Sequence, residues 1–211
     1  MTETIQGRLP QIAFTGRVLG QLLSASPDDE ACRPLLTALG DVAWLDEWPY
    51  GGPDVLRGIA GLLAEGLSDA GAETPAQAYQ RLFIGPDALA APPWGSVYLD
   101  RESVLFGEST LSLRRWRQEQ GIETQQQDNE PEDSIGMLLL LSAWLAEQQR
   151  GELLDSLLAR HLFPWCFRYL TLLETHAGHP LYLGAAKLAA LTLREWQASC
   201  DVASLPARLY F

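Results

Sequence analysis

The sequence predicts an all-α fold, a single-domain helical bundle of about nine helices over residues 1–211. Apolar residues recur at the spacing of one helix face through most of the chain. Alternating strand-like runs are nearly absent, and only residues 96–99 are ambiguous. The composition agrees, since 47% hydrophobic residues and a mean hydropathy of -0.04 are ordinary for a globular protein. A chain of 211 residues is long enough to bury a substantial core.

Four helices are expected in the first half of the chain, over residues 9–24, 35–40, 53–71 and 74–84. Pro53 and Pro75 stand at first helical positions, where the missing N–H would have no intrahelical partner. Gly40 and the Gly85-Pro86 pair are stop signals, because glycine and proline do not continue a helix well.

Five helices are expected in the second half, over residues 111–121, from 131 onward, 153–163, 165–175 and 180–199. The stretch Ile135–Ala146 is apolar almost all round, which indicates a core helix. We expect Pro131 to be its first residue, with Glu130, Glu132 and Asp133 offsetting the positive end of the helix dipole. Helix capping therefore explains these acids, which would also hold negative charge at the rim of the core.

The net charge of -12 and the sequence pI near 4.6 argue against nucleic acid and anionic membranes as partners. They favour a cationic ligand or peptide. The N-terminus shows no secretory signal pattern, and Ile135–Ala146, the longest apolar run, is shorter than the roughly 18 residues that span a bilayer. Three cysteines without paired spacing predict neither disulfides nor a zinc site, so we expect a cytoplasmic protein.

A long stretch between two predicted helices, residues 85–109, has no clear helical pattern and is rich in aromatic residues. Loops of this length are uncommon in compact domains and are often functional. We expect Tyr98 and Phe106 to hold this stretch on the core. Trp94, between Pro93 and Gly95, is the ring most expected to line a groove.

Several blocks of this sequence resemble the signature blocks of one known family. They are residues 79–86 (YQRLFIGP), 92–99 (PPWGSVYL), 105–110 (LFGEST), 129–133 (NEPED), 161–165 (HLFPW) and 191–196 (LTLREW). Together they cover most of the chain, which is similar to the TorD/DmsD family of chaperones for molybdenum-containing redox enzymes exported by the twin-arginine (Tat) pathway. One position departs from the family motif, because Ser134 stands where the family usually has histidine.

The resemblance implies an all-helical domain that binds the twin-arginine leader of a molybdoenzyme, here expected to be the dimethyl sulfoxide reductase catalytic subunit, and supports its folding, cofactor loading and export. The leader-binding residues it implies are Tyr79, Leu82, Phe83, Pro93, Trp94, Gly107, Glu108, Glu130, Pro131, Asp133 and Ser134. The carboxylates would pair with the two arginines, and the apolar side chains would hold the hydrophobic part of the leader. Components of the Tat translocase are further candidate partners.

Two other functions, an enzyme and a metal-binding protein, have less support in the sequence. A small-molecule hydrolase or transferase could use Glu130 and Asp133 as acid and base, but no nucleophile, metal or oxyanion donor accompanies them. His161, His176 and His179 are better explained by capping and solvent contact than by a metal. We expect no catalytic residue, cofactor or metal, and a monomer, with a segment-exchanged dimer left open. A nucleotide or the molybdenum cofactor as ligand, and the client itself, also stay open.

Overall fold

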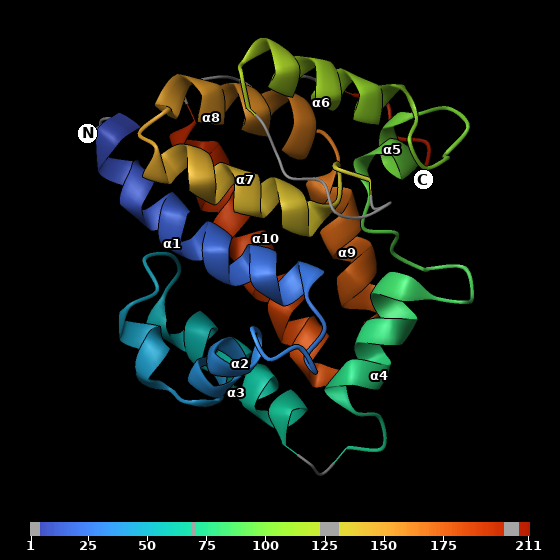
Figure 1. The fold of residues 1–211 in the computed structure, drawn as a ribbon. Helices are drawn as coiled ribbons and strands as arrows, with labels where there is room; N and C mark the ends of the chain where they lie inside the picture. Colours follow the sequence, from blue (N-terminus) through green and yellow to red (C-terminus); the bar gives the residue numbers. More distant parts are fainter. Residues whose placement is uncertain (1–4, 69–70, 123–130, 201–206) are drawn as a thin grey trace.

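The computed structural model describes residues 5–68, 71–122, 131–200 and 207–211, and this part of the chain is a bundle of helices (Figure 1). The elements are α1 (Ile5–Ser24), α2 (Arg33–Gly40), a 3₁₀ turn (Ala43–Asp46), α3 (Pro53–Leu67), α4 (Pro75–Tyr79), α5 (Gly95–Leu99), α6 (Glu108–Glu119), α7 (Ile135–Glu147), α8 (Gly151–Leu157), α9 (Cys166–His176) and α10 (Pro180–Ser199). Within these residues no strand is formed, and the all-α prediction is confirmed.

Two helix pairs organise the bundle: α1 packs along α7, and α10 packs on α3 (Figure 1). The first pair is close because glycines face the partner helix. A Cβ on Gly20 would lie 2.7 Å from the Leu140 Cγ, and one on Gly136 would lie 2.5 Å from the Ser24 Cβ. Side chains at either glycine would push the helices apart. As expected, α7 is mostly buried, with Ile135, Leu138 and Leu139 fully enclosed.

Several predicted helix ends are confirmed. The range Pro180–Ser199 is as expected, and Pro53 and Pro75 do begin helices. The Thr74 hydroxyl oxygen accepts the Gln77 N–H at 3.2 Å, and the Gln77 side-chain oxygen accepts the Thr74 N–H. The two bonds form a capping box. The sequence missed two short elements, the 3₁₀ turn and α5, and α1 starts four residues earlier than predicted.

The predicted start of the core helix at Pro131 is wrong. Helix α7 begins at Ile135, and its N-cap is Ser134, whose Oγ accepts the Met137 N–H at 3.4 Å. Residues 131–133 form a turn outside the helix: the Pro131 carbonyl accepts the Ser134 N–H at 3.2 Å, and the Asp133 carbonyl pairs with another segment, as described below. Glu132 and Asp133 therefore do not occupy the first turn of α7, and Glu130 lies outside the described residues.

Two turns of wider π-helix continue the ends of α4 and α8, over residues 80–84 and 158–162. The first carries Phe83 and the second carries His161. Single π turns of this kind often lie at functional sites. Both of these turns border hollows of the molecular surface.

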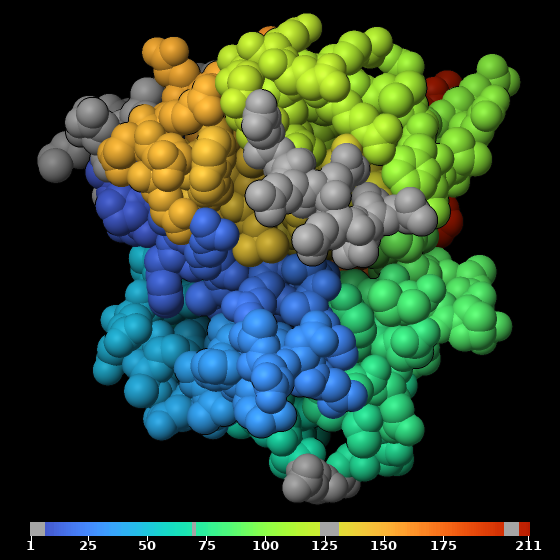
Figure 2. Space-filling model, viewed as in Figure 1, coloured from blue at the N-terminus to red at the C-terminus, as the bar shows by residue number. Residues whose placement is uncertain are grey.

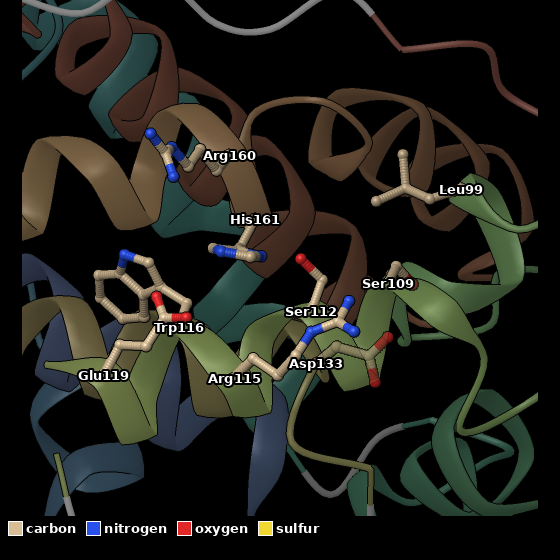
Figure 3. Close-up of a pocket in the computed structure, with 10 residues that line it drawn as sticks. Leu99, Ser109, Ser112, Arg115, Trp116, Glu119, Asp133, Arg160 and His161 are labelled. Carbon is tan, nitrogen blue, oxygen red and sulfur yellow. The ribbon is translucent and has the colours of Figure 1, made fainter. Parts of the chain in front are cut away.

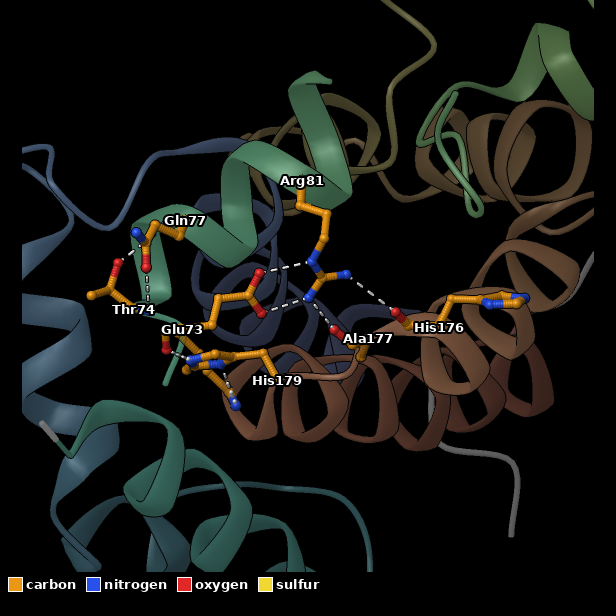
Figure 4. A network of polar contacts seen from close by, with 8 residues as sticks. Glu73, Thr74, Gln77, Arg81, His176, Ala177 and His179 are labelled. Carbon is orange, nitrogen blue, oxygen red and sulfur yellow. Dashed lines mark hydrogen bonds and ion pairs between the residues drawn. The ribbon is translucent and has the colours of Figure 1, made fainter. Parts of the chain in front are cut away.

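A polar network fixes α4 against the junction of α9 and α10 (Figure 4). Arg81 donates two hydrogen bonds to the Glu73 carboxylate, at 2.8 and 2.7 Å, and one to the Ala177 carbonyl at 2.8 Å. His179 caps α10, because its Nδ1 accepts the Leu181 N–H at 3.3 Å. The predicted capping role of this histidine is confirmed, and His176 is exposed in the last turn of α9.

Candidate functional site

The two most distinctive segments of the sequence lie side by side. Trp94 and Ser134 form an isolated antiparallel bridge. The Asp133 carbonyl accepts the Gly95 N–H at 3.0 Å, and the Pro93 carbonyl accepts the Ile135 N–H at 2.8 Å. We call residues 93–95 and 133–135 the paired segments. Their backbone pairing brings the aromatic loop and the acidic motif together at the N-terminus of α7.

An apolar hollow of about 220 Å³ opens on one side of the paired segments. It is lined by Leu23, Ser24, Tyr79, Phe83, Ile84, Pro93, Trp94 and Ser134. The Tyr79 ring stacks on the Phe83 ring with centroids 5.0 Å apart, and the Tyr79 hydroxyl donates to the Ser24 carbonyl at 2.8 Å. These contacts fix the rings in place, so the hollow is formed without a ligand.

Five of the predicted site residues, Tyr79, Phe83, Pro93, Trp94 and Ser134, therefore line one hollow. Leu82 differs, because it is buried and faces the core instead of the hollow. Ile84, which the sequence reasoning omitted, lines the hollow and is 58% exposed. Figure 2 shows the surface in the same view as Figure 1, with α2, α3 and α4 in the lower part and α6 along the top.

A second, polar hollow of about 390 Å³ also borders the paired segments, at Gly95 and Asp133 (Figure 3). Its lining comes from α5, α6, the second π turn and Asp133. The lining residues are Gly95, Leu99, Ser109, Ser112, Arg115, Trp116, Glu119, Asp133, Arg160 and His161. Only Asp133 among them belongs to the predicted site.

Asp133 is 4% exposed, and its two carboxylate oxygens differ. Oδ2 accepts the Ser96 N–H at 2.6 Å and so caps α5 instead of α7. Oδ1 has no hydrogen-bond partner, and the nearby Ser96 and Thr110 hydroxyls also make no hydrogen bond. Burial raises the pKa of Asp133, and the hydrogen bond from the Ser96 N–H opposes this change. The protein thus holds a carboxylate whose charged form is incompletely stabilised.

Two further acids near the site, Glu132 and Glu108, have cationic partners. The Arg114 Nε donates to both Glu132 carboxylate oxygens, at 2.7 and 2.8 Å, and Glu108 pairs with Arg115. Gly107 is the N-cap of α6, where a Cβ would overlap the Asp100 carboxylate. Pro131 is buried. Neither Gly107 nor Glu108 lines either of the two hollows.

His161 lies in the polar hollow, apart from the other two histidines. Burial, and next the positive charge of Arg160, lower the pKa of His161 to about 4. The ring is therefore neutral at physiological pH, and its Nε2 has no hydrogen-bond partner. Among the described residues, no group of three or more His, Cys, Asp and Glu side chains is arranged to hold a metal ion.

Apart from Asp133, none of the residues that line the polar hollow was predicted from the sequence. The cluster Arg114, Arg115 and Arg117 on α6 was a visible signal, since residues three apart on a helix share a face. Its partner Glu132 lies 18 positions away in the chain, so no local pattern could reveal the pairing. Arg160 and His161 reach the hollow only through the packing of α8 and its π turn.

Comparison with known proteins gives consistent matches. Residues 52–170 match the family model described as "Nitrate reductase delta subunit". The chain is 51% identical to the "Tat proofreading chaperone DmsD" of Salmonella typhimurium over 186 residues, which are 88% of this chain and 89% of that protein. It is 37% identical to the "Probable Tat proofreading chaperone DmsD" of Haemophilus influenzae over 98% of this chain and all of that protein. It is 30% identical to the "Chaperone protein YcdY" of Escherichia coli over 82% of this chain and 86% of that protein.

Proposed function

The chain belongs to the TorD/DmsD family of Tat proofreading chaperones, and we propose that it binds the twin-arginine leader of a molybdoenzyme at the paired segments. The client proposed is the catalytic subunit of dimethyl sulfoxide reductase. The chaperone would act in the cytoplasm before export, supporting folding and cofactor loading. Within the described residues, no helix has the length and apolar character needed to cross a membrane.

One observation supports this proposal above the others: the same paired segments line both an apolar hollow and a polar hollow with a buried carboxylate. A twin-arginine leader presents the same two chemistries next to each other, since two arginines are followed by an apolar stretch. A peptide lying across the paired segments can place apolar side chains against Trp94 and Phe83, and arginine toward Asp133.

Typical interaction free energies indicate how much each hollow contributes to leader binding. Partly exposed ion pairs contribute about 0.2–1 kcal/mol each. Two such pairs fall well short of the roughly 8 kcal/mol of a micromolar complex. Burial of about 400 Å² of apolar leader at ~25 cal/mol per Å² yields on the order of 10 kcal/mol before the costs of association. The apolar hollow should therefore set affinity, and the polar hollow should set which peptide is accepted.

The alternative of a hydrolase or transferase is not supported. The similar proteins are named chaperones. Glu132 is paired with Arg114, and Asp133 caps α5, so the acidic motif already has structural roles. We propose a binding protein without catalytic residues, cofactor or metal, and a monomer with the Tat translocase as a further partner.

Calorimetric titration with synthetic leader peptides tests the proposal. The chaperone should bind leaders that carry the arginine pair and an apolar stretch, and should bind more weakly when both arginines are changed to lysine, because lysine cannot form paired hydrogen bonds to a carboxylate. Leaders of several molybdoenzymes in the same assay would identify the client. Equal binding of the arginine and lysine leaders would contradict the assigned role of the carboxylates, and no binding to any leader would contradict the function.

A further inference from the structure

We propose that Glu119 selects for arginine by receiving one leader guanidinium in the polar hollow while Asp133 receives the other, an inference that rests on the function proposed above. Both residues line this hollow, Asp133 at the paired segments and Glu119 on α6 (Figure 3). Glu119 belongs to none of the family-like sequence blocks.

The carboxylates around the polar hollow differ in what they already bind. Glu132 is held by Arg114, Glu108 by Arg115, and Asp100 by the Ser109 N–H and hydroxyl. Glu119 is exposed, and within the described chain it makes no hydrogen bond or ion pair. Among these lining and neighbouring acids, Glu119 and the Oδ1 of Asp133 are the acceptors left for a ligand.

The shape of the site suits a guanidinium better than an ammonium. Arginine carries five N–H donors in a planar fork, so a guanidinium can donate two parallel hydrogen bonds to the exposed Glu119 carboxylate, whereas an ammonium cannot. Trp116, one helical turn before Glu119 on α6, is buried against His161 and forms part of the wall of the hollow. An unsatisfied buried acceptor is unfavourable, and a donor that reaches Asp133 Oδ1 would relieve that penalty.

Two arginines of the protein itself border this hollow and affect the choice of ligand. Arg115 pairs with Glu108, so most of its charge is balanced. Arg160 is exposed next to His161 and has no anionic partner among the described residues. It should oppose an arriving guanidinium, whereas it would attract an anion. Removing the charges of Glu119 and Arg160 separately therefore gives effects of opposite sign, and the signs report which kind of ligand enters.

The test is a calorimetric titration of the full chain with a twin-arginine leader and with two single-substitution leaders, each having one arginine replaced by glutamine. The protein variants are Glu119→Gln, Arg160→Gln and the control Glu152→Gln, an exposed acid on α8 that lines neither hollow. Because Glu119, Glu152 and Arg160 are all exposed, thermal melts should confirm that each variant folds like the parent.

We expect Glu119→Gln to weaken binding of the twin-arginine leader by about two- to five-fold, and Arg160→Gln to strengthen it by a similar factor. Glu152→Gln should leave the affinity unchanged. Against one of the two single-substitution leaders, Glu119→Gln should cause no further loss, because its partner arginine is already absent.

Other results would overturn the inference in distinguishable ways. If the parent protein binds the leader but Glu119→Gln binds as well as Glu152→Gln, Glu119 does not contact an arginine, while the proposed function stands. If Arg160→Gln weakens binding and Glu119→Gln strengthens it, the hollow receives an anionic group and the assignment is wrong. If the parent protein binds no leader, the proposed function and this inference both fail.

Discussion

The two hollows that border the paired segments are built from neighbouring residues yet have opposite character. Trp94 and Ser134 line the apolar hollow, and Gly95 and Asp133 line the polar one. The change from one hollow to the other falls between Trp94 and Gly95 in one segment and between Asp133 and Ser134 in the other, and both Trp94 and Ser134 have extended backbone. A short bridge between two loops is therefore enough to set an apolar surface beside a charged one.

The hollows also differ in how many of their buried polar atoms lack a hydrogen-bond partner among the described residues: one lining the apolar hollow, the Trp94 Nε1, and two lining the polar hollow. In the apolar hollow, rings stack and the Tyr79 hydroxyl is hydrogen-bonded, so the folded state gains from the contacts. In the polar hollow, the Oδ1 of Asp133 and the Nε2 of His161 are buried without partners. Unsatisfied buried polar groups reduce stability, and they persist most often where function needs them. The polar hollow is thus the part of the site where stability and binding should conflict.

The largest effect is expected from a side chain at Gly95, because it would disturb both hollows. A Cβ there would lie 2.8 Å from the Trp165 Nε1 and 3.4 Å from the Asp133 Oδ2. Gly95→Val should lower the free energy of unfolding by about 1–3 kcal/mol and weaken leader binding more than ten-fold. Chemical denaturation and calorimetry measure the two effects.

Gly61→Ala is the control for adding a side chain at a glycine. Gly61 lies on α3, and a Cβ there would meet nothing within 4 Å. This substitution should stabilise the protein by about 0.5–1 kcal/mol without changing leader affinity. A Gly95→Val protein that is as stable as the parent and binds leader equally well would show that the paired segments do not depend on this close approach.

The next effect separates stability from binding at Asp133. Its pKa is raised in the folded state, so the folded chain binds more protons than the unfolded chain, and stability falls as pH rises through that interval. Asp133→Asn removes the carboxylate and with it the fall in stability at higher pH, while the amide oxygen of the new side chain can still accept the Ser96 N–H. We expect the variant to be more stable than the parent at neutral pH and to bind leader more weakly. Urea denaturation at neutral pH measures the first effect, and a less stable variant would contradict it.

Leader binding should also depend on pH through the same carboxylate. A guanidinium favours ionised Asp133, so a protonated Asp133 must lose its proton when leader binds. Because burial raises this pKa above the ordinary range of an aspartate, affinity should weaken as pH falls from neutral through the raised pKa of the free protein. Calorimetry at several pH values measures this slope. The slope should disappear in Asp133→Asn, and a variant that keeps the full slope would assign the effect to another group.

The smallest effect is expected at Glu108, whose pair with Arg115 is largely exposed. Glu108→Gln should change the free energy of unfolding by less than about 0.5 kcal/mol. It should weaken leader binding by less than about two-fold, because the released Arg115 adds positive charge to the polar hollow. A thermal melt and a titration suffice, and a large loss of affinity would mean that Glu108 itself binds the leader.

Local signals in the sequence predicted most helices, but the start of α7 depended on a distant contact. Thr74, Pro53 and Pro180 act on their own first turns, so their positions could be read from the chain. Pro131 carried an equally good local signal, yet Asp133 and Ile135 use their backbone groups to pair with residues 93–95. Tertiary pairing outweighed the capping preference.

Those parts of the candidate site that lie within a single short segment of sequence could be predicted, and those that depend on contacts between distant segments could not. The aromatic loop and the acidic motif could be selected from their residues, and five of the residues chosen line one hollow. Which hollow each residue faces could not be predicted, because the alternation of Ser134 and Asp133 follows from extended pairing and not from a helix. The pairing of Glu132 with Arg114 was equally out of reach, since it joins α6 to residues outside any helix.

The central claim is that the apolar hollow sets affinity and the polar hollow sets selection. Titration of one twin-arginine leader into Trp94→Ala and Asp133→Asn tests it directly. We predict the larger loss for Trp94→Ala, about ten-fold or more, because an aromatic anchor is removed from a formed hollow. Asp133→Asn should lose less affinity but discriminate less between the twin-arginine and twin-lysine leaders. The reverse order of affinities, with Asp133→Asn the more damaging change, would contradict this division.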